Sequence, residues 1–157
     1  MNDIKHWRGF TSSVNRITPD IIRKSYRLGY EWMAQRESKF LCILSKYSYF
    51  PKLIAVGKHH IDLSYCGEQV KSIKKYQKQL YEVLDILNKE KIIHRDINPK
   101  NLLELNNEIR LIDFGWSLFD GELDTPIKAH ISLGGRYYSN RIWDDSKAVE
   151  ILLAESK

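Results

Sequence analysis

The sequence predicts an α+β fold, with a small N-terminal part made mostly of strands plus one helix, and a mostly helical C-terminal part. Short segments rich in β-branched residues and bounded by turn-forming residues occur between 7 and 63 and predict strands. Apolar residues near helical spacing in 29–46 and 72–90 predict helices, and a third helix is expected to end at 153. Strands and helices are therefore largely segregated along the chain.

The N-terminal strands are expected to form two hairpins on either side of one helix. Thr18, Pro19 and Asp20 supply the first turn, because Pro presets φ and Asp can hydrogen-bond its own backbone. The helix predicted over 29–46 ends before Pro51, which cannot continue it. The expected strands are 7–17, 20–26, 53–57 and 60–63.

The C-terminal part is predicted to contain two helices around a hairpin. An apolar stripe predicts a long helix over 72–90. The hairpin pairs 102–105 with 109–112 and has Asn residues at its turn. Asp144 or Asp145 starts the final helix.

Length and composition indicate one folded domain over residues 1–157. A 43% hydrophobic content supports a core, and the net charge of +5 comes from scattered Lys and Arg, so no nucleic-acid partner is expected. A nucleic-acid binder is the weakest hypothesis of function. Cys42 and Cys66 lie far apart, which argues against a disulfide framework or zinc site. With neither a signal-peptide core nor a transmembrane segment, a cytoplasmic location is expected.

Two short motifs carry the chemistry. His94-Arg95-Asp96 is followed by Asn101, five residues after Asp96, and then by Asp113-Phe114-Gly115. Phosphoryl transfer from ATP needs such a set, because one carboxylate orients the attacking hydroxyl while an amide oxygen and a second carboxylate hold magnesium. The competing interpretation is a buried hairpin whose polar residues only satisfy turns.

The motifs and the order of elements resemble the protein-kinase-like superfamily over nearly the whole chain. The resemblance implies a bilobal fold, with an N-lobe over about 1–63, a hinge over about 64–68 and a reduced C-lobe over about 69–157. It also implies a kinase that uses ATP and Mg²⁺ to phosphorylate a hydroxyl group.

The resemblance assigns roles to five residues. Asp96 matches the catalytic aspartate, and Asn101 and Asp113 match the magnesium ligands. Gly115 is expected to free the backbone of the turn that presents Asp113. Lys24 matches the strand lysine that contacts the nucleotide phosphates and pairs with a helix glutamate, for which Glu37 is the candidate. The alternative for Lys24 is an exposed strand lysine.

The nucleotide site that the resemblance implies is partly degraded. Of the three glycines in the phosphate-covering loop, Gly9 alone remains. Backbone groups of the hinge would bind adenine between apolar side chains, although plain core packing explains the same residues. The implied nucleotide-binding residues are Gly9, Val14, Ile22, Lys24, Leu63, Ser64, Cys66 and Leu103.

Three departures from the family leave the acceptor open. Asn98 stands two residues after Asp96, where serine/threonine members usually carry Lys. The Ala-Pro-Glu that closes the activation segment is missing, and 132–140 lies in its place. The later C-lobe helices are absent. A protein Ser/Thr hydroxyl and a saccharide hydroxyl are therefore favoured equally, and a pseudokinase that binds or scaffolds without turnover is the alternative.

The final helix raises two further expectations. Either Asp145 or Asp144 matches the aspartate that braces the catalytic loop. The reduced C-lobe is expected to leave apolar surface on this helix, which a protein partner or a second copy would cover. That surface would comprise Val149, Ile151, Leu152 and Leu153.

Overall fold

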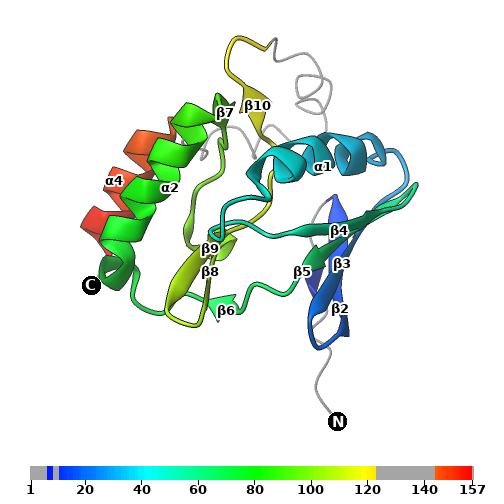
Figure 1. Ribbon diagram of the computed structural model, residues 1–157, viewed down its shortest axis with the longest axis horizontal. Helices are drawn as coiled ribbons and strands as arrows, with labels where there is room; N and C mark the ends of the chain where they lie inside the picture. Colours follow the sequence, from blue (N-terminus) through cyan, green and yellow to red (C-terminus); the bar gives the residue numbers. More distant parts are fainter. Residues whose placement is uncertain (1–6, 9–10, 123–143, 157) are drawn as a thin grey trace.

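The computed structural model describes residues 7–8, 11–122 and 144–156. Figure 1 shows an N-terminal sheet with one helix, α1 (Trp32–Leu44), beside a C-terminal part that contains most of the helical turns. A single cluster of buried apolar side chains includes residues of both parts, so they share a core. The predicted α+β class is confirmed, while the boundaries proposed for lobes and hinge stay predictions.

The N-terminal sheet has five antiparallel strands, and its first hairpin differs from the prediction. The strand expected over 7–17 is two strands, which pair so that Trp7 faces Val14 and Arg8 faces Ser13. Periodicity could not reveal this split, because two short strands have the same alternation as one long strand. In spatial order the strands are β1 (Trp7–Arg8), β2 (Ser12–Thr18), β3 (Ile21–Tyr26), β5 (His60–Ser64) and β4 (Leu53–Val56).

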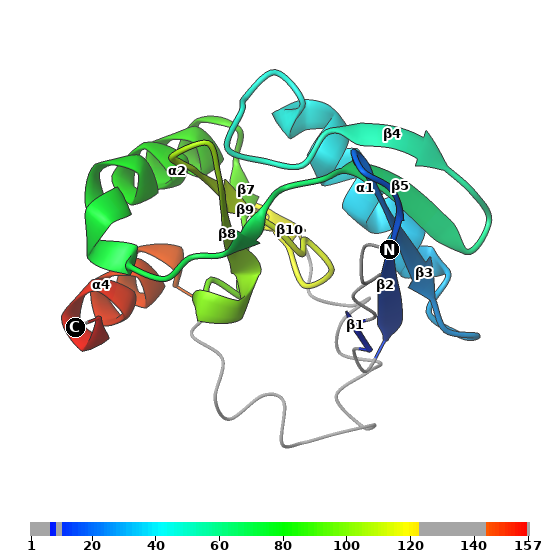
Figure 2. The ribbon, with the colours of Figure 1, turned by 90° about the horizontal axis from the view of Figure 1, so that it is seen from below.

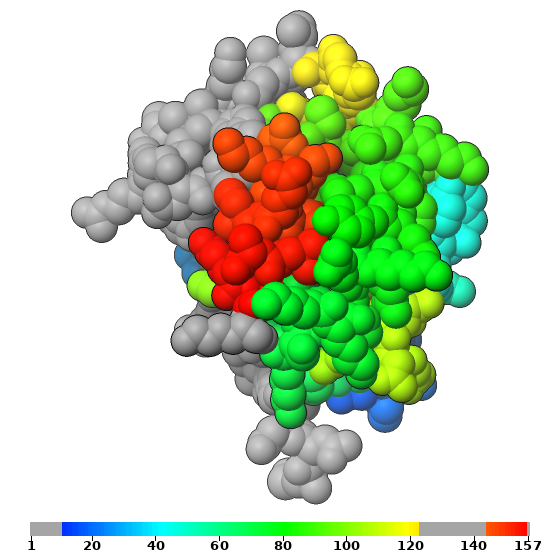
Figure 3. All heavy atoms as spheres, turned by 90° about the vertical axis from the view of Figure 1, so that its left-hand side faces the viewer, coloured from blue at the N-terminus to red at the C-terminus, as the bar shows by residue number. Residues whose placement is uncertain are grey.

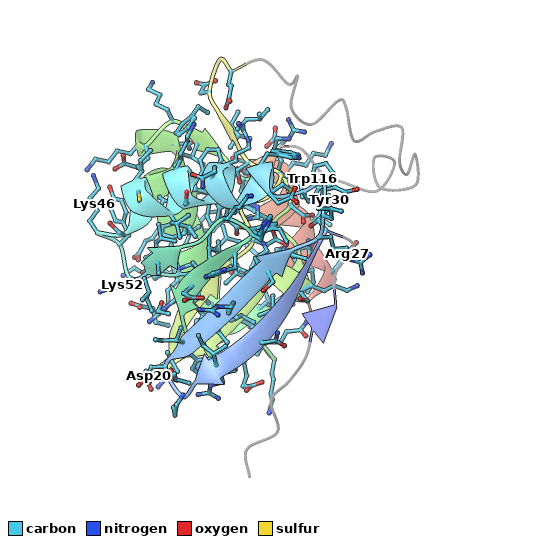
Figure 4. The ribbon with its side chains drawn as sticks, turned by 90° about the vertical axis from the view of Figure 1, so that its right-hand side faces the viewer. Asp20, Arg27, Tyr30, Lys46, Lys52 and Trp116 are labelled. Atoms are coloured by element: carbon cyan, nitrogen blue, oxygen red, sulfur yellow. The ribbon has the colours of Figure 1, made fainter. Side chains whose placement is uncertain are left out.

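The helix α1 crosses the sheet. Figure 4 looks onto β2 and β3, with Asp20 at the turn of their hairpin and Arg27 at its other end. The helix begins at Trp32, later than predicted, because Gly29 adopts a φ of 90° that interrupts the helical path. One face of α1 is buried and includes both apolar residues and Glu37.

In the described residues of the C-terminal part there are two small sheets, and the helices α2 and α4 lie side by side (Figure 2). The helix predicted over 72–90 opens with a 3₁₀ turn, and the predicted hairpin is present, with Asn106 and Asn107 both at positive φ. One sheet has the order β6-β8-β9, and β10 pairs with β7. The elements are β6 (Glu68–Gln69), η1 (Ile73–Tyr76), α2 (Gln77–Lys89), β7 (Ile92–Ile93), η2 (Pro99–Asn101), β8 (Leu102–Leu105), β9 (Glu108–Leu111), β10 (Leu118–Phe119) and α4 (Asp145–Glu155).

The expected apolar surface on the final helix is largely absent. Val149 and Leu152 are 1% and 6% exposed, and Ile151 and Leu153 are half-buried. Figure 3 shows why, since α4 lies directly against α2. Packing within the chain thus covers most of this face, and a covering partner stays a prediction. Among the described residues, the large apolar side chains that are exposed are Ile17, Leu28, Ile54, Val56 and Tyr81.

Helix length bears on the membrane prediction. Within the part of the chain that the structure describes, no helix combines the length and the apolar character that crossing a bilayer requires.

Candidate active site

Lys24 of β3 lies at the centre of an ion cluster. Its Nζ is 2.8 Å from Oε2 of Glu37 on α1 and 3.1 Å from Oδ1 of Asp113. The side chains of Lys24 and Glu37 are 8% and 1% exposed, whereas that of Asp113 is 39% exposed. The structure therefore brings Lys24 and Glu37 together, and Lys24 is not an exposed strand lysine.

The carboxylate of Glu37 has partners on both oxygens. Besides Lys24, the hydroxyl of Tyr26 donates to Oε2, and the backbone N–H of Phe114 donates to Oε1 at 3.0 Å. A buried carboxylate is costly unless it is paired and hydrogen-bonded. These three donors come from β3 and from the segment after β9, so Glu37 joins α1 to both.

The charges in this cluster stabilise one another. Burial would lower the pKa of Lys24, but Asp113 and Glu37 outweigh it and raise that pKa well above the ordinary lysine value. Burial would likewise raise the pKa of Asp113, yet Lys24 and the N–H of Gly115 hold it below the ordinary carboxyl value. Lys24 is thus a cation and Asp113 an anion at neutral pH. The pKa of Tyr26 is raised well above its usual value by burial and by Glu37, which keeps its hydroxyl a donor.

A strained turn presents Asp113. Its φ is 65°, in the left-handed region that a non-glycine residue occupies at a cost of about 1–3 kcal/mol. Gly115 was expected to supply the backbone freedom here, but the left-handed residue is Asp113 itself. The N–H of Gly115 instead donates to Oδ1 of Asp113 at 3.2 Å. Phe114, fully buried between Phe40 and His94, anchors the turn.

Asp96 is held by two side-chain amides. Nδ2 of Asn101 lies 2.8 Å from the backbone oxygen of Asp96 and 3.1 Å from its Oδ2. Nδ2 of Asn98 lies 3.0 Å from the same backbone oxygen and 3.1 Å from Oδ1. We refer to Asp96, Asn98 and Asn101 as the amide cluster, and to Lys24, Glu37 and Asp113 as the ion cluster.

A backbone hydrogen bond connects the two clusters. The N–H of Ile112, which precedes Asp113, donates to the carbonyl oxygen of Asn101 at 3.0 Å. Asp96 and Asn101 are therefore in direct contact, Asp113 follows the residue that bonds Asn101, and Lys24 contacts Asp113.

The loop that carries Asp96 is braced from inside the core. His94 is fully buried, and its Nδ1 accepts the N–H of Asp96 at 3.1 Å while its Nε2 lies 3.0 Å from the carbonyl of Ile112. Because a backbone N–H only donates and a carbonyl only accepts, the ring must carry its hydrogen on Nε2.

Asp145 supplies the second brace. Its Oδ2 and Oδ1 accept the N–H groups of His94 and Arg95 at 2.7 and 2.9 Å. Asp144 caps α4 instead, since its side chain accepts the N–H of Lys147 at 3.0 Å. Of the two candidate braces, the structure selects Asp145.

The predicted nucleotide-binding residues divide between the two parts. In the sheet, Val14 lies opposite Lys24 and Ile22 lies opposite Leu63. Opposite residues share a face, as do residues two apart on β3, so these four side chains lie on one face. Leu103 comes from β8 in the C-terminal part.

The residues predicted for the hinge begin at Ser64, the last residue of β5. Cys66 is 4% exposed, and burial raises the pKa of its thiol to about 11, so it is a neutral apolar residue here. Next to it, Gly67 has a φ of 93°, and a Cβ there would lie 1.9 Å from the carbonyl oxygen of Glu104. Only glycine fits at this connection. Gly9 lies outside the described residues, as does the segment 132–140.

The donor atoms suit magnesium bound together with phosphates. Asn101 turns its Nδ2 toward Asp96, and Oδ1 of Asp113 accepts Lys24 and Gly115. Within the described part of the chain, no group of three or more His, Cys, Asp or Glu side chains could hold a metal. One carboxylate and one amide oxygen fit Mg²⁺, which usually takes one or two carboxylates, waters and substrate phosphates rather than an all-protein cage.

Sequence reasoning missed two contacts. Tyr26 lies two residues after Lys24 on β3, hence on the same face, and this spacing could have indicated its bond to Glu37. Asn98 was treated only as a departure from the family, although an Asn before Pro at a turn favours local side-chain bonds.

Comparison with known proteins identifies the same family. The family model described as "Protein kinase domain" matches residues 32–139, more than half of the chain. Similar curated proteins include Aurora kinase of Saccharomyces cerevisiae, 50% identical over 46 residues (29% of this chain, 12% of that protein). Aurora kinase C of Mus musculus is 36% identical over 90 residues, 48% of this chain and 32% of that protein.

A third relative matches a similar extent. Aurora kinase of Candida glabrata is 32% identical over 95 residues, which cover 51% of this chain and 25% of that protein. In each of these three relatives the match covers a third of the protein or less.

Proposed function

Because the chain belongs to the protein kinase domain family, we propose that it transfers the γ-phosphate of ATP to a hydroxyl group of a protein, in the presence of Mg²⁺. The observation that carries this proposal is the junction of the two clusters. A buried lysine pairs with both Glu37 and Asp113, while Asp96 lies in the adjoining loop with both carboxylate oxygens hydrogen-bonded.

Each residue of the clusters then has a chemical task. Lys24, held by Glu37, would contact the nucleotide phosphates. Asp113 and Asn101 would hold Mg²⁺, which when bound neutralises charge on the phosphates. Asp96 would accept a hydrogen bond from the acceptor hydroxyl and align it with the γ-phosphate. The strand face with Val14, Ile22 and Leu63 would cover the adenine, and the backbone at Ser64 and Cys66 would hydrogen-bond it.

The family favours a protein as acceptor. Both the matching family model and the spelling His94-Arg95-Asp96 point to protein Ser/Thr hydroxyls. A saccharide acceptor has no support from the similar proteins described above, which are named as Aurora kinases.

The substitution Asp96→Asn tests the proposal. It keeps the shape and removes the charge that orients the hydroxyl, so kcat should fall by about 10²–10⁴-fold. Affinity for Mg²⁺-ATP should change less than about twofold, because Asp96 acts on the acceptor. Transfer of labelled phosphate to peptides, and in parallel to saccharides, measures the rate, and calorimetry measures the affinity.

Asp85→Asn is the matched control, because Asp85 is exposed on α2. It should leave both quantities unchanged. An Asp96→Asn variant with the wild-type rate would refute the role of Asp96. Wild-type chain that binds Mg²⁺-ATP but transfers phosphate to no acceptor would favour the scaffold alternative instead.

A further inference from the structure

The geometry points to Asn98 as a positioning residue: we propose that its side-chain amide orients the carboxylate of Asp96. This inference deepens the proposed function and rests on it. Asn98 itself would contact neither the nucleotide nor the acceptor, and would act through Asp96.

Two side-chain amides donate to the carboxylate of Asp96, one to each oxygen. Asn98 Nδ2 reaches Oδ1 at 3.1 Å, and Asn101 Nδ2 reaches Oδ2 at 3.1 Å. Each amide also donates to the backbone oxygen of Asp96, at 3.0 and 2.8 Å. With one donor on each oxygen, the carboxylate plane is fixed at two points and not at one.

The orientation of the Asn98 amide follows from a third contact. Its Oδ1 accepts the backbone N–H of Lys100 at 2.9 Å, at the start of η2. A backbone N–H can only donate, so the oxygen must face Lys100 and the NH₂ group must face Asp96. The same side chain therefore caps the turn and holds the carboxylate.

A lysine at this position could not do both. An ammonium group has three donors and no acceptor, so it would leave the N–H of Lys100 without its cap. Its charge would also sit on a long, flexible stem. The loop therefore has no cation two residues after Asp96. In its place, Asn98 contributes a neutral hydrogen bond that orients the carboxylate.

Substitutions can separate the cap from the positioning. Asn98→Ser keeps an oxygen that caps the N–H of Lys100 but has no hydrogen-bond donor in the place of Nδ2 beside Asp96 Oδ1. We expect it to lower kcat roughly 10- to 100-fold, as small misplacements of a reacting group do. The dissociation constant for Mg²⁺-ATP should stay within about twofold, and the thermal midpoint close to that of the wild type. Asn88→Ser, at an exposed position on α2, is the control.

A double-mutant cycle shows whether Asn98 acts through Asp96. In the Asp96→Asn background, Asn98→Ser should change the residual rate less than about twofold, since the carboxylate it orients is gone. A role confined to the turn, or a direct role at the phosphate, would give the same fold-loss in both backgrounds. Either that result or a wild-type rate for Asn98→Ser would overturn the proposal.

Crystal structures give a readout that does not depend on turnover. Asp96 should lose its single side-chain orientation in Asn98→Ser and keep it in Asn88→Ser. An unchanged Asp96 rotamer in Asn98→Ser would overturn the inference even if the wild-type chain transferred no phosphate. If instead the wild type is inactive but the rotamer changes, the proposed function fails while the positioning contact stands.

Discussion

The ion cluster and the amide cluster adjoin the same site but are built in different ways. Lys24, Glu37 and Asp113 come from β3, α1 and the segment after β9, which lie far apart in the sequence. Asp96, Asn98 and Asn101 lie within one loop of six residues, 96–101. Charge balances charge in the first cluster, whereas neutral amides hold a single charge in the second.

Because of this difference, the ion cluster should mainly affect the stability of the fold, and the amide cluster should mainly affect reactivity. A buried charge that loses its partner is strongly destabilising. The ion cluster must therefore contribute to the packing of the N-terminal sheet on α1. In the amide cluster Asp96 and Asn98 are half-buried and close in sequence, so losing the Asn98 amide should leave the fold intact but free the carboxylate. The predictions below test this contrast.

Lys24→Met should give the largest effect on stability. It leaves Glu37, 1% exposed, without its cation, and the free energy of unfolding should fall by about 3–5 kcal/mol. Urea unfolding followed by fluorescence measures this change. Lys52→Met, at an exposed position (Figure 4), is the control and should stay within about 0.5 kcal/mol of the wild type. Equal effects of the two substitutions would remove the distinction between the clusters.

Asp145→Asn should have an intermediate effect and tests whether the amide cluster is self-sufficient. The carboxylate accepts two backbone N–H groups, and an asparagine oxygen can replace only one acceptor. One N–H in a buried loop is then unsatisfied, at a cost of about 1–3 kcal/mol, measured by thermal unfolding.

The neighbouring substitution Asp144→Asn is the control for that experiment. Asn caps a helix as well as Asp does, so Asp144→Asn should change stability by only a few tenths of a kcal/mol, or about the error of the measurement. If Asp145→Asn changed stability as little as Asp144→Asn does, the loop would hold Asp96 without a brace from α4.

The Arg23–Asp62 pair shows what burial adds, and its loss should have the smallest effect. Arg23 is next to Lys24 on β3, but its side chain is 40% exposed and lies 2.8 Å from Asp62. Arg23→Gln should destabilise the fold less than Lys24→Met does at pH 7, because solvent screens the 40% exposed side chain of Arg23, although that of Asp62 is only 11% exposed. If Arg23→Gln destabilised the fold as much as Lys24→Met does, burial would not explain why the ion cluster matters for stability.

The pH dependence of this pair has a definite sign. The hydrogen bond from Arg23 lowers the pKa of Asp62, so the pair stabilises the folded state above the ordinary carboxyl pKa. That contribution is lost as the pH falls through the lowered pKa. Urea melts from pH 7 down to about pH 3 should therefore show the difference between Arg23→Gln and wild type shrinking toward the acid end.

Much of the site was predictable from local patterns. The turn with Asn106 and Asn107 and the helix after residue 72 follow from local backbone preferences and apolar periodicity. The motif residues could be recognised because their reaction needs certain side chains at fixed positions in a loop, and this requirement fixes their spacing in the sequence. The strand over 7–17 was predicted wrongly, because alternation does not record where a strand ends and pairs back on itself.

Other features depended on contacts between distant segments. The choice of Asp145 over Asp144 could not be made from sequence, since both can cap a helix and only the packing of α4 shows which one reaches His94. Burial of Val149 and Leu152 depends likewise on where α2 lies.

The sequence by itself determined the α+β class, the family and the residues of the two motifs, because hydrophobic period and motif spacing are properties of neighbouring residues. Tertiary structure decided how Glu37 is satisfied, which aspartate braces the loop and what Asn98 contacts. These outcomes depend on the positions of atoms from separate segments. The net free energy of hydrogen bonding and desolvation changes from favourable to unfavourable when those atoms move by about one or two ångströms.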